Sequence, residues 1–77
     1  MEIHCGRLIE NELRNQRRSA HWLANELHCD RTNVYKIFKR KNLDAELLMH
    51  LSIILQKNFF ETLTNETVTE IAKVQNM

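Results

Sequence analysis

Residues 20–40 decide the fold, and they read AHWLANELHCDRTNVYKIFKR. Apolar side chains recur there three or four positions apart, which is the spacing that gathers side chains on one side of a helix. The residues on this apolar side are Leu23, Ala24, Leu27, Cys29, Val34 and Ile37. The other side of the second half carries basic or hydrogen-bonding groups: Arg31, Thr32, Asn33 and Lys36. The segment predicts two short helices that pack through a tight turn and leave one polar, basic helix side free.

Good capping residues precede both helices. Ser19 is a preferred N-cap for a helix over 20–28, and Asp30 can cap a helix over 31–40. We expect the Asp30 carboxylate to accept the backbone N–H of the residue two or three positions later, and its charge suits the helix dipole. The inward residues of the second helix are Val34, Ile37 and Phe38.

Two further helices flank this pair. The first, over 6–16, is predicted because apolar residues recur at helical spacing: Cys5, Leu8, Ile9 and Leu13. The second, over 45–57, follows the N-cap residue Asp44 and carries an apolar stripe wide enough to close the core. Asn58 is expected to end this helix in a left-handed conformation. We expect one of the two adjacent phenylalanines, Phe59 and Phe60, to be buried in the core and the other to be exposed.

The end of the chain has a weaker signal. Several residues fit one side of a short helix from Asn65, namely Val68, Ile71, Ala72 and Gln75. Four threonines between residues 62 and 69 lower the helix propensity of this part of the chain. A short helix and a frayed tail are therefore both open alternatives for residues 62–77.

Composition points to a small all-α domain. The 77 residues suit one domain, and 43% hydrophobic residues suffice for one core. The absence of proline and the single glycine leave little material for hairpins. We predict a compact four- or five-helix domain over residues 1–61. No apolar run approaches the roughly 20 residues that span a bilayer, and charged residues interrupt the segment where a signal peptide needs an apolar core. The expected location is the cytoplasm, with no membrane partner.

Charge is distributed very unevenly. Residues 14–41 contain eight basic and two acidic side chains, a net charge of +6. Residues 1–13 carry a net charge of −2 and residues 42–77 a net charge of −3. A basic middle between acidic ends indicates a footprint for a polyanion on one side of the protein.

The spacing Leu-Ala-x-x-Leu-x-Cys-Asp-x-x-x-Val-x-x-Ile, from Leu23 to Ile37, resembles the helix-turn-helix of the lambda-repressor and Cro type, the XRE family. That resemblance implies a lambda-repressor-like fold, a second helix in the major groove of double-stranded DNA, a role in transcription regulation and a homodimer. The chain departs from the family at two positions. Ala20 stands where the family often has a phosphate-contacting glutamine, and His28 stands where it usually has glycine.

The resemblance also assigns roles to individual residues. Arg31, Thr32 and Lys36 match positions that touch base edges. Asn33 is a further candidate base reader, although it could bond a phosphate or the helix backbone instead. Tyr35 and Lys39 match family positions that contact bases or phosphates in some members. The charge pattern and the missing glutamine at Ala20 add five further candidate phosphate contacts: Arg17, Arg18, Ser19, Arg40 and Lys41. Each of these has a solvated surface position as its alternative. Candidate dimer contacts, with core packing as their alternative, are Trp22, Phe59 and Phe60.

Other classes of function are less well supported. Two His-Cys pairs, His4-Cys5 and His28-Cys29, contain zinc-ligand residue types, but adjacent side chains rarely point to one metal and both cysteines fall on apolar sides. We predict no metal and no cofactor. No nucleophile has a base at a motif spacing, so an enzyme is not expected. The open alternative to a DNA-binding regulator is a protein-binding module on the same fold, such as an antitoxin or a small adaptor.

Overall fold

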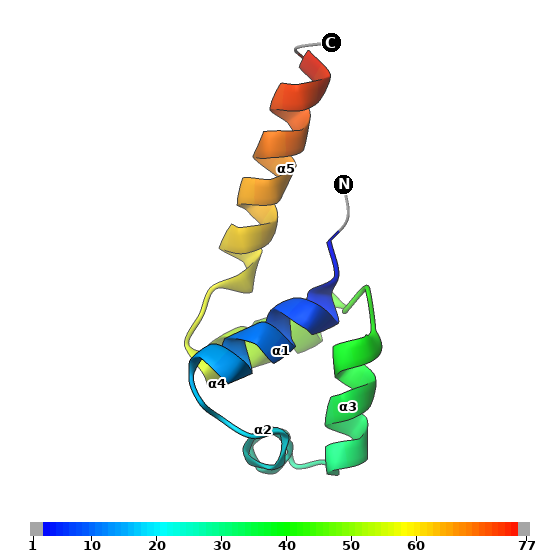
Figure 1. Ribbon diagram of the computed structural model, residues 1–77, viewed down its shortest axis with the longest axis vertical. Helices are drawn as coiled ribbons and strands as arrows, with labels where there is room; N and C mark the ends of the chain where they lie inside the picture. The colour runs from blue at the N-terminus through cyan, green and yellow to red at the C-terminus, as the bar shows by residue number, and fades with distance from the viewer. Residues whose placement is uncertain (1–2, 76–77) are drawn as a thin grey trace.

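The computed structural model describes residues 3–75, and they form an all-helical bundle with one projecting helix (Figure 1). Each of the first four helices begins and ends within two residues of its predicted bounds. The helices are α1 (Cys5–Asn15), α2 (Ala20–Leu27), α3 (Arg31–Lys39), α4 (Ala45–Leu55) and α5 (Phe59–Gln75). None of these helices, within the described part of the chain, is long and apolar enough to cross a membrane.

The core lies among the first four helices and the start of α5. The side chains of Ile9, Leu23, Val34 and Leu51 are completely buried, so α1, α2, α3 and α4 each contribute to it. Phe59 adds the largest fully buried side chain, at 1% exposure. The predicted inward sides of all four helices are thereby confirmed.

The α2–α3 pair is joined by a three-residue connection that begins at His28. Ser19 caps α2 as predicted, since its Oγ accepts the Trp22 backbone N–H at 3.0 Å. His28 adopts the left-handed conformation, with φ 56° and ψ 46°. The Cys29 amide then donates to the Ala24 carbonyl at 2.9 Å, which satisfies one of the free carbonyls at the end of α2. Histidine thus fills a position where glycine would be less strained.

The predicted cap of α3 is wrong in one respect. Asp30 occupies the N-cap position, and its backbone carbonyl accepts the Asn33 and Val34 amides, but its carboxylate makes no capping bond. The side chain is exposed. Water can therefore solvate both the carboxylate and the first amides of α3, so the bond is not required for either group.

The beginning of α1 docks against the end of α3. The Cys5 amide donates to the Lys41 carbonyl and the Gly6 amide to the Arg40 carbonyl, each at 2.9 Å. A Cβ atom on Gly6 would lie 2.2 Å from the carbonyl oxygen of Ile37 and within 2.7 Å of two further carbonyl oxygens. Only glycine permits this approach. The junction also places the positive end of one helix dipole against the negative end of another.

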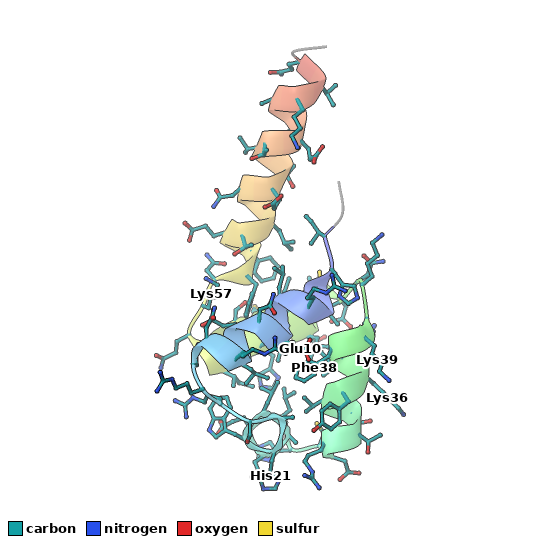
Figure 2. The ribbon with its side chains drawn as sticks, in the orientation of Figure 1. Glu10, His21, Lys36, Phe38, Lys39 and Lys57 are labelled. Carbon is teal, nitrogen blue, oxygen red and sulfur yellow. The ribbon has the colours of Figure 1, made fainter. Side chains whose placement is uncertain are left out.

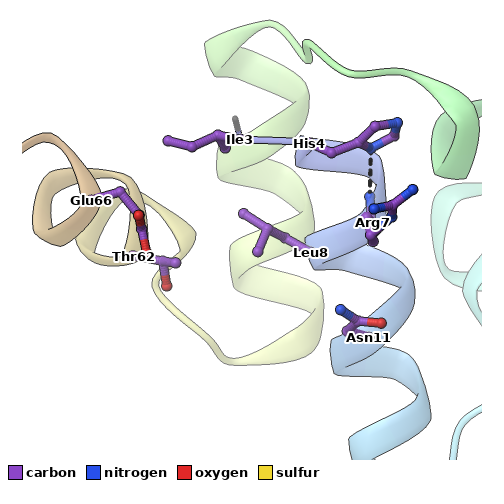
Figure 3. A pocket seen from close by; sticks show the side chains of 7 residues that line it. All are labelled: Ile3, His4, Arg7, Leu8, Asn11, Thr62 and Glu66. Carbon is purple, nitrogen blue, oxygen red and sulfur yellow. Dashed lines mark hydrogen bonds between the residues drawn. The ribbon is translucent and has the colours of Figure 1, made fainter. Parts of the chain in front are cut away.

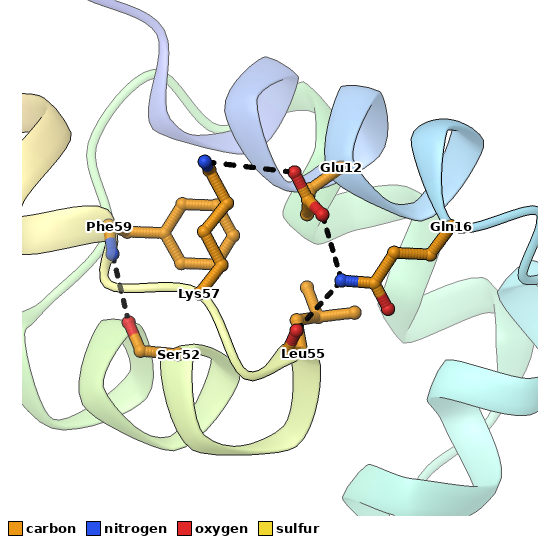
Figure 4. A network of polar contacts seen from close by, with 6 residues as sticks. All are labelled: Glu12, Gln16, Ser52, Leu55, Lys57 and Phe59. Carbon is orange, nitrogen blue, oxygen red and sulfur yellow. Dashed lines mark hydrogen bonds and ion pairs between the residues drawn. The ribbon is translucent and has the colours of Figure 1, made fainter.

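A polar network joins α1 to the α4–α5 connection (Figure 4). The Gln16 side-chain amide donates to the Leu55 carbonyl at 2.7 Å and to the Glu12 carboxylate at 2.8 Å. Lys57 approaches the same carboxylate at 3.9 Å. Gln16 therefore satisfies a carbonyl at the end of α4 that the helix itself leaves free.

The expected left-handed end of α4 at Asn58 is wrong. Gln56 holds that conformation, with φ 53°, and α4 stops at Leu55 because the Lys57 amide returns to the Ser52 carbonyl at 3.0 Å. Asn58 instead begins the next helix, where its Oδ1 accepts the Glu61 amide at 3.2 Å. Asparagine is among the best N-cap residues, which explains the exchange of roles.

Helix α5 is longer than the short helix predicted from Asn65, and it crosses the predicted boundary between residues 61 and 62. It begins at Phe59 because that side chain and Leu63 pack on the core. Threonines along it donate to carbonyls one turn earlier, for example Thr64 to Phe60 at 2.8 Å. These bonds satisfy the hydroxyl groups within the helix itself.

Gly6→Ala tests the docking of α1 on α3. We expect the free energy of unfolding to fall by about 1–3 kcal/mol because the new methyl group forces the two backbones apart. That loss should exceed the gain of about 1 kcal/mol from the better helix propensity of alanine. Urea unfolding followed by circular dichroism measures it. Asn11→Ala, at an exposed position of α1, is the control and should change stability by less than about 0.5 kcal/mol. A Gly6→Ala protein as stable as the parent would contradict the close approach.

Candidate nucleic-acid interface

One side of α3 is free and basic. All four candidate base readers, Arg31, Thr32, Asn33 and Lys36, are exposed. Figure 2 shows Lys36 and Lys39 pointing away from the body of the molecule, both from α3. Residues 31–41 contain five basic and no acidic side chains. This exposed side therefore carries a positive potential together with hydrogen-bond donors from arginine, lysine, threonine and asparagine.

The other side of α3 holds the helix in place. Val34 is 0% exposed and Ile37 is 9% exposed. Phe38 is partly buried against the core, and its ring meets the Tyr35 ring edge to face, with centroids 6.0 Å apart and an interplanar angle of 77°. Tyr35 itself is half exposed. A helix packed in this way can present its exposed side chains without reorienting.

Three consecutive cations follow at the end of α3. Lys39, Arg40 and Lys41 are all exposed. The carbonyls of Arg40 and Lys41 accept the first amides of α1, so the backbone beneath these side chains is fixed. The close approach at Gly6 thus positions this basic segment as well as the core. Lys36 and Lys39 stand three residues apart on α3, so they share one side of the helix, and Arg40 and Lys41 follow directly in the chain.

Three of the other predicted phosphate contacts, Arg17, Arg18 and Ser19, lie between α1 and α2. Arg17 and Arg18 belong to the connection between α1 and α2, which lies on the opposite side of α2 from α3 in Figure 1. The Arg18 guanidinium stacks over the Trp22 ring, 4.2 Å from its centroid, a cation–π contact that the sequence analysis missed. The spacing of four residues between them is a local signal for such a pair. Ser19 is exposed, but its hydroxyl already caps α2.

The candidate dimer contacts divide into three cases. Phe59 is 1% exposed and belongs to the core, so its assignment as a dimer contact is corrected: no surface is left for a partner to cover. Trp22 is half buried beneath Arg18. Phe60 is 37% exposed. Five other exposed apolar side chains lie on α4 and α5, in the C-terminal part of the chain: Met49, Ile53, Val68, Ile71 and Val74.

A small cavity of about 210 Å³ opens between the start of α1 and α5 (Figure 3). Its lining mixes charged, polar and aliphatic side chains, including Arg7, Leu8 and Glu66. His4 lies at its edge, where the Nδ1 atom accepts the Arg7 amide at 3.0 Å and caps α1. No group of three or more His, Cys, Asp or Glu side chains in residues 3–75 is arranged to hold a metal ion.

Comparisons of the chain with protein-family models, curated proteins and solved structures find no match. Residues 3–75 form a five-helix all-α domain, and its most distinctive surface is the exposed basic side of α3. The function is therefore inferred from the geometry and charge of this surface.

Proposed function

We propose that the protein binds double-stranded DNA in a sequence-specific manner and acts as a transcriptional regulator. In this proposal α2 and α3 form a helix-turn-helix, and α3 enters the major groove. The observation that carries the proposal is that α3 is buried along one side and presents an uninterrupted basic, hydrogen-bonding side along the other. A rigid helix of this kind fits the width of the major groove.

Base reading would fall to the first two turns of α3. Arg31 can donate two hydrogen bonds to the O6 and N7 atoms of guanine, and Lys36 can donate to the same acceptors. Thr32 can bond a base or place its methyl group against that of thymine. Asn33 can pair with adenine in two-bond geometry, or bond a phosphate. All four side chains are exposed, so none must break a native contact to reach DNA.

Phosphate contacts would come from the end of α3. Lys39, Arg40 and Lys41 extend the basic surface beyond the helix. The backbone carbonyls of Arg40 and Lys41 accept hydrogen bonds from α1. Phosphate contacts from these residues would therefore set how deeply α3 enters the groove. Arg17 and Arg18 would contact a phosphate only where the DNA also reaches the α1–α2 connection. Contacts of this kind supply affinity without sequence information, and they make the affinity depend on salt.

A second candidate, a protein-binding module, is favoured by a different observation. Six apolar side chains on α4 and α5 are more than a third exposed: Met49, Ile53, Phe60, Val68, Ile71 and Val74. A patch of this kind is typical of a protein contact. It lies on helices other than α3, so the two functions can coexist.

Charge reversal of Lys39 tests the polyanion contact. Binding of a fluorescent random-sequence duplex should weaken steeply with salt, and Lys39→Glu should weaken binding and lower the salt slope by about one phosphate contact, or roughly 0.9. Lys73→Glu makes the same charge change on an exposed position of α5 and should bind like the parent. Fluorescence anisotropy over a salt series measures both. Equal losses in the two variants would show that only net charge matters.

Arg31→Ala tests base reading. On a selected site it should cost about 1–3 kcal/mol of binding free energy and relax the preference at one base position. Arg7→Ala removes the same type of exposed side chain from α1 and should leave the preference unchanged. Site selection from a random duplex library, followed by titration, measures both effects. An unaltered preference in Arg31→Ala would remove this residue from the base readers.

A further inference from the structure

The cavity between α1 and α5 has two unlike walls (Figure 3). Arg7 and Asn11 line it from α1, whereas Thr62 and Glu66 line it from α5. Leu8 lies between the two walls and is partly buried. The Arg7 guanidinium makes one wall positive, and the Glu66 carboxylate makes the other negative. The two sides of the cavity therefore favour groups of opposite charge.

The polar side chains of both walls lack partners within residues 3–75. No side-chain hydrogen bond or ion pair is made there by any of the four: Arg7, Asn11, Thr62 and Glu66. The other three threonines of α5 instead donate to carbonyls one turn earlier. A ligand could therefore bond these four groups without breaking a contact of the folded chain.

The cavity suits a small ligand with an apolar part. Its volume of about 210 Å³ is below the roughly 300–1,000 Å³ of pockets that hold drug-sized ligands. At about 30 Å³ for each group the size of a water molecule, it has room for about seven such groups. Ile3 and Leu8 are both partly buried at this cavity, so they offer an aliphatic surface to the middle of a ligand.

We propose that this cavity binds a small zwitterion in which a short aliphatic chain separates an ammonium group from a carboxylate. Arg7 and Asn11 donate to the carboxylate of the ligand. Glu66 and Thr62 accept from its ammonium group, and its methylene groups lie on Leu8. The two charges of the ligand stand apart, because Arg7 and Glu66 come from different helices and do not pair with each other. A linear ω-amino acid such as 4-aminobutyrate has this size and arrangement of charge.

A bound ligand would bridge α1 to a part of α5 that lies beyond its packing on the core. Phe59 and Leu63 make that packing, and Glu66 follows them along the helix at an exposed position. Occupancy therefore stabilises the folded chain, and the thermal unfolding midpoint measured by calorimetry should rise with ligand concentration. No residue of α3 lines the cavity. The ligand should leave base reading unchanged, and the proposal does not rest on DNA binding.

A titration of the isotope-labelled protein with 4-aminobutyrate tests the site. Backbone amide shifts should change most in residues 3–11 and 62–66, with a dissociation constant of about 1 mM or tighter. Butyrate lacks the ammonium group and butylamine lacks the carboxylate, so each should bind about threefold to tenfold more weakly. Equal affinity for the three compounds would overturn the proposal, as would no change at about ten times that concentration. Shifts centred on α3 would also overturn it, since they would show an adventitious ion on the basic side of that helix.

Matched substitutions assign the two ends of the ligand. Glu66→Gln should weaken 4-aminobutyrate binding by about threefold to tenfold but bind butyrate no more weakly, because butyrate has no ammonium group. Arg7→Gln should weaken butyrate binding in the same proportion and bind butylamine no more weakly. Glu61→Gln makes the same change at an exposed position of α5 outside the cavity and should bind like the parent. Undiminished 4-aminobutyrate binding by Glu66→Gln, or an equal loss of all three compounds in both variants, would contradict the assignment.

Discussion

The close approach of Gly6 to the end of α3 is the constraint on which the rest of the structure depends. Two backbone hydrogen bonds of 2.9 Å join the first amides of α1 to the last carbonyls after α3, and a Cβ atom would not fit between them. With α3 fixed at this end and packed along Val34 and Ile37, its other side faces solvent. The same junction therefore organises the core and orients the basic surface.

The sequence predicts the first four helices well because their signals are local. Apolar residues repeat at helical spacing, and Ser19 and Asp44 cap helices where expected. The left-handed conformation of His28 also follows from its position in the tight turn. The docking of α1 on α3 is not predictable in this way. It joins residues about 35 positions apart in the chain, and a lone glycine within a helix pattern does not indicate which backbone approaches it.

The errors arise where two local roles compete. Asn58 suits either the end of one helix or the beginning of the next, and only the packing of Phe59 on the core decides between them. Asp30 suits a cap, but its exposed carboxylate is solvated without one. The length of α5 was underestimated because threonine lowers helix propensity, whereas here the threonine hydroxyls bond within the helix. The candidate DNA surface on α3 was predicted residue by residue because helical periodicity alone separates its two sides. Arg17 and Arg18 lie away from this surface, in the connection between α1 and α2. Helical periodicity does not predict that position, because it depends on how the helices pack.

The molecule has two distinct surfaces, a basic one on α3 and an apolar one on α4 and α5. The most direct test of the central claim is a titration of the isotope-labelled protein with a DNA duplex, followed by backbone amide chemical shifts. We predict that the shifts change most in residues 31–41 and little in α4 and α5. Changes confined to α4 and α5, or none at all at low salt, would contradict the assignment of α3 as the DNA-binding helix.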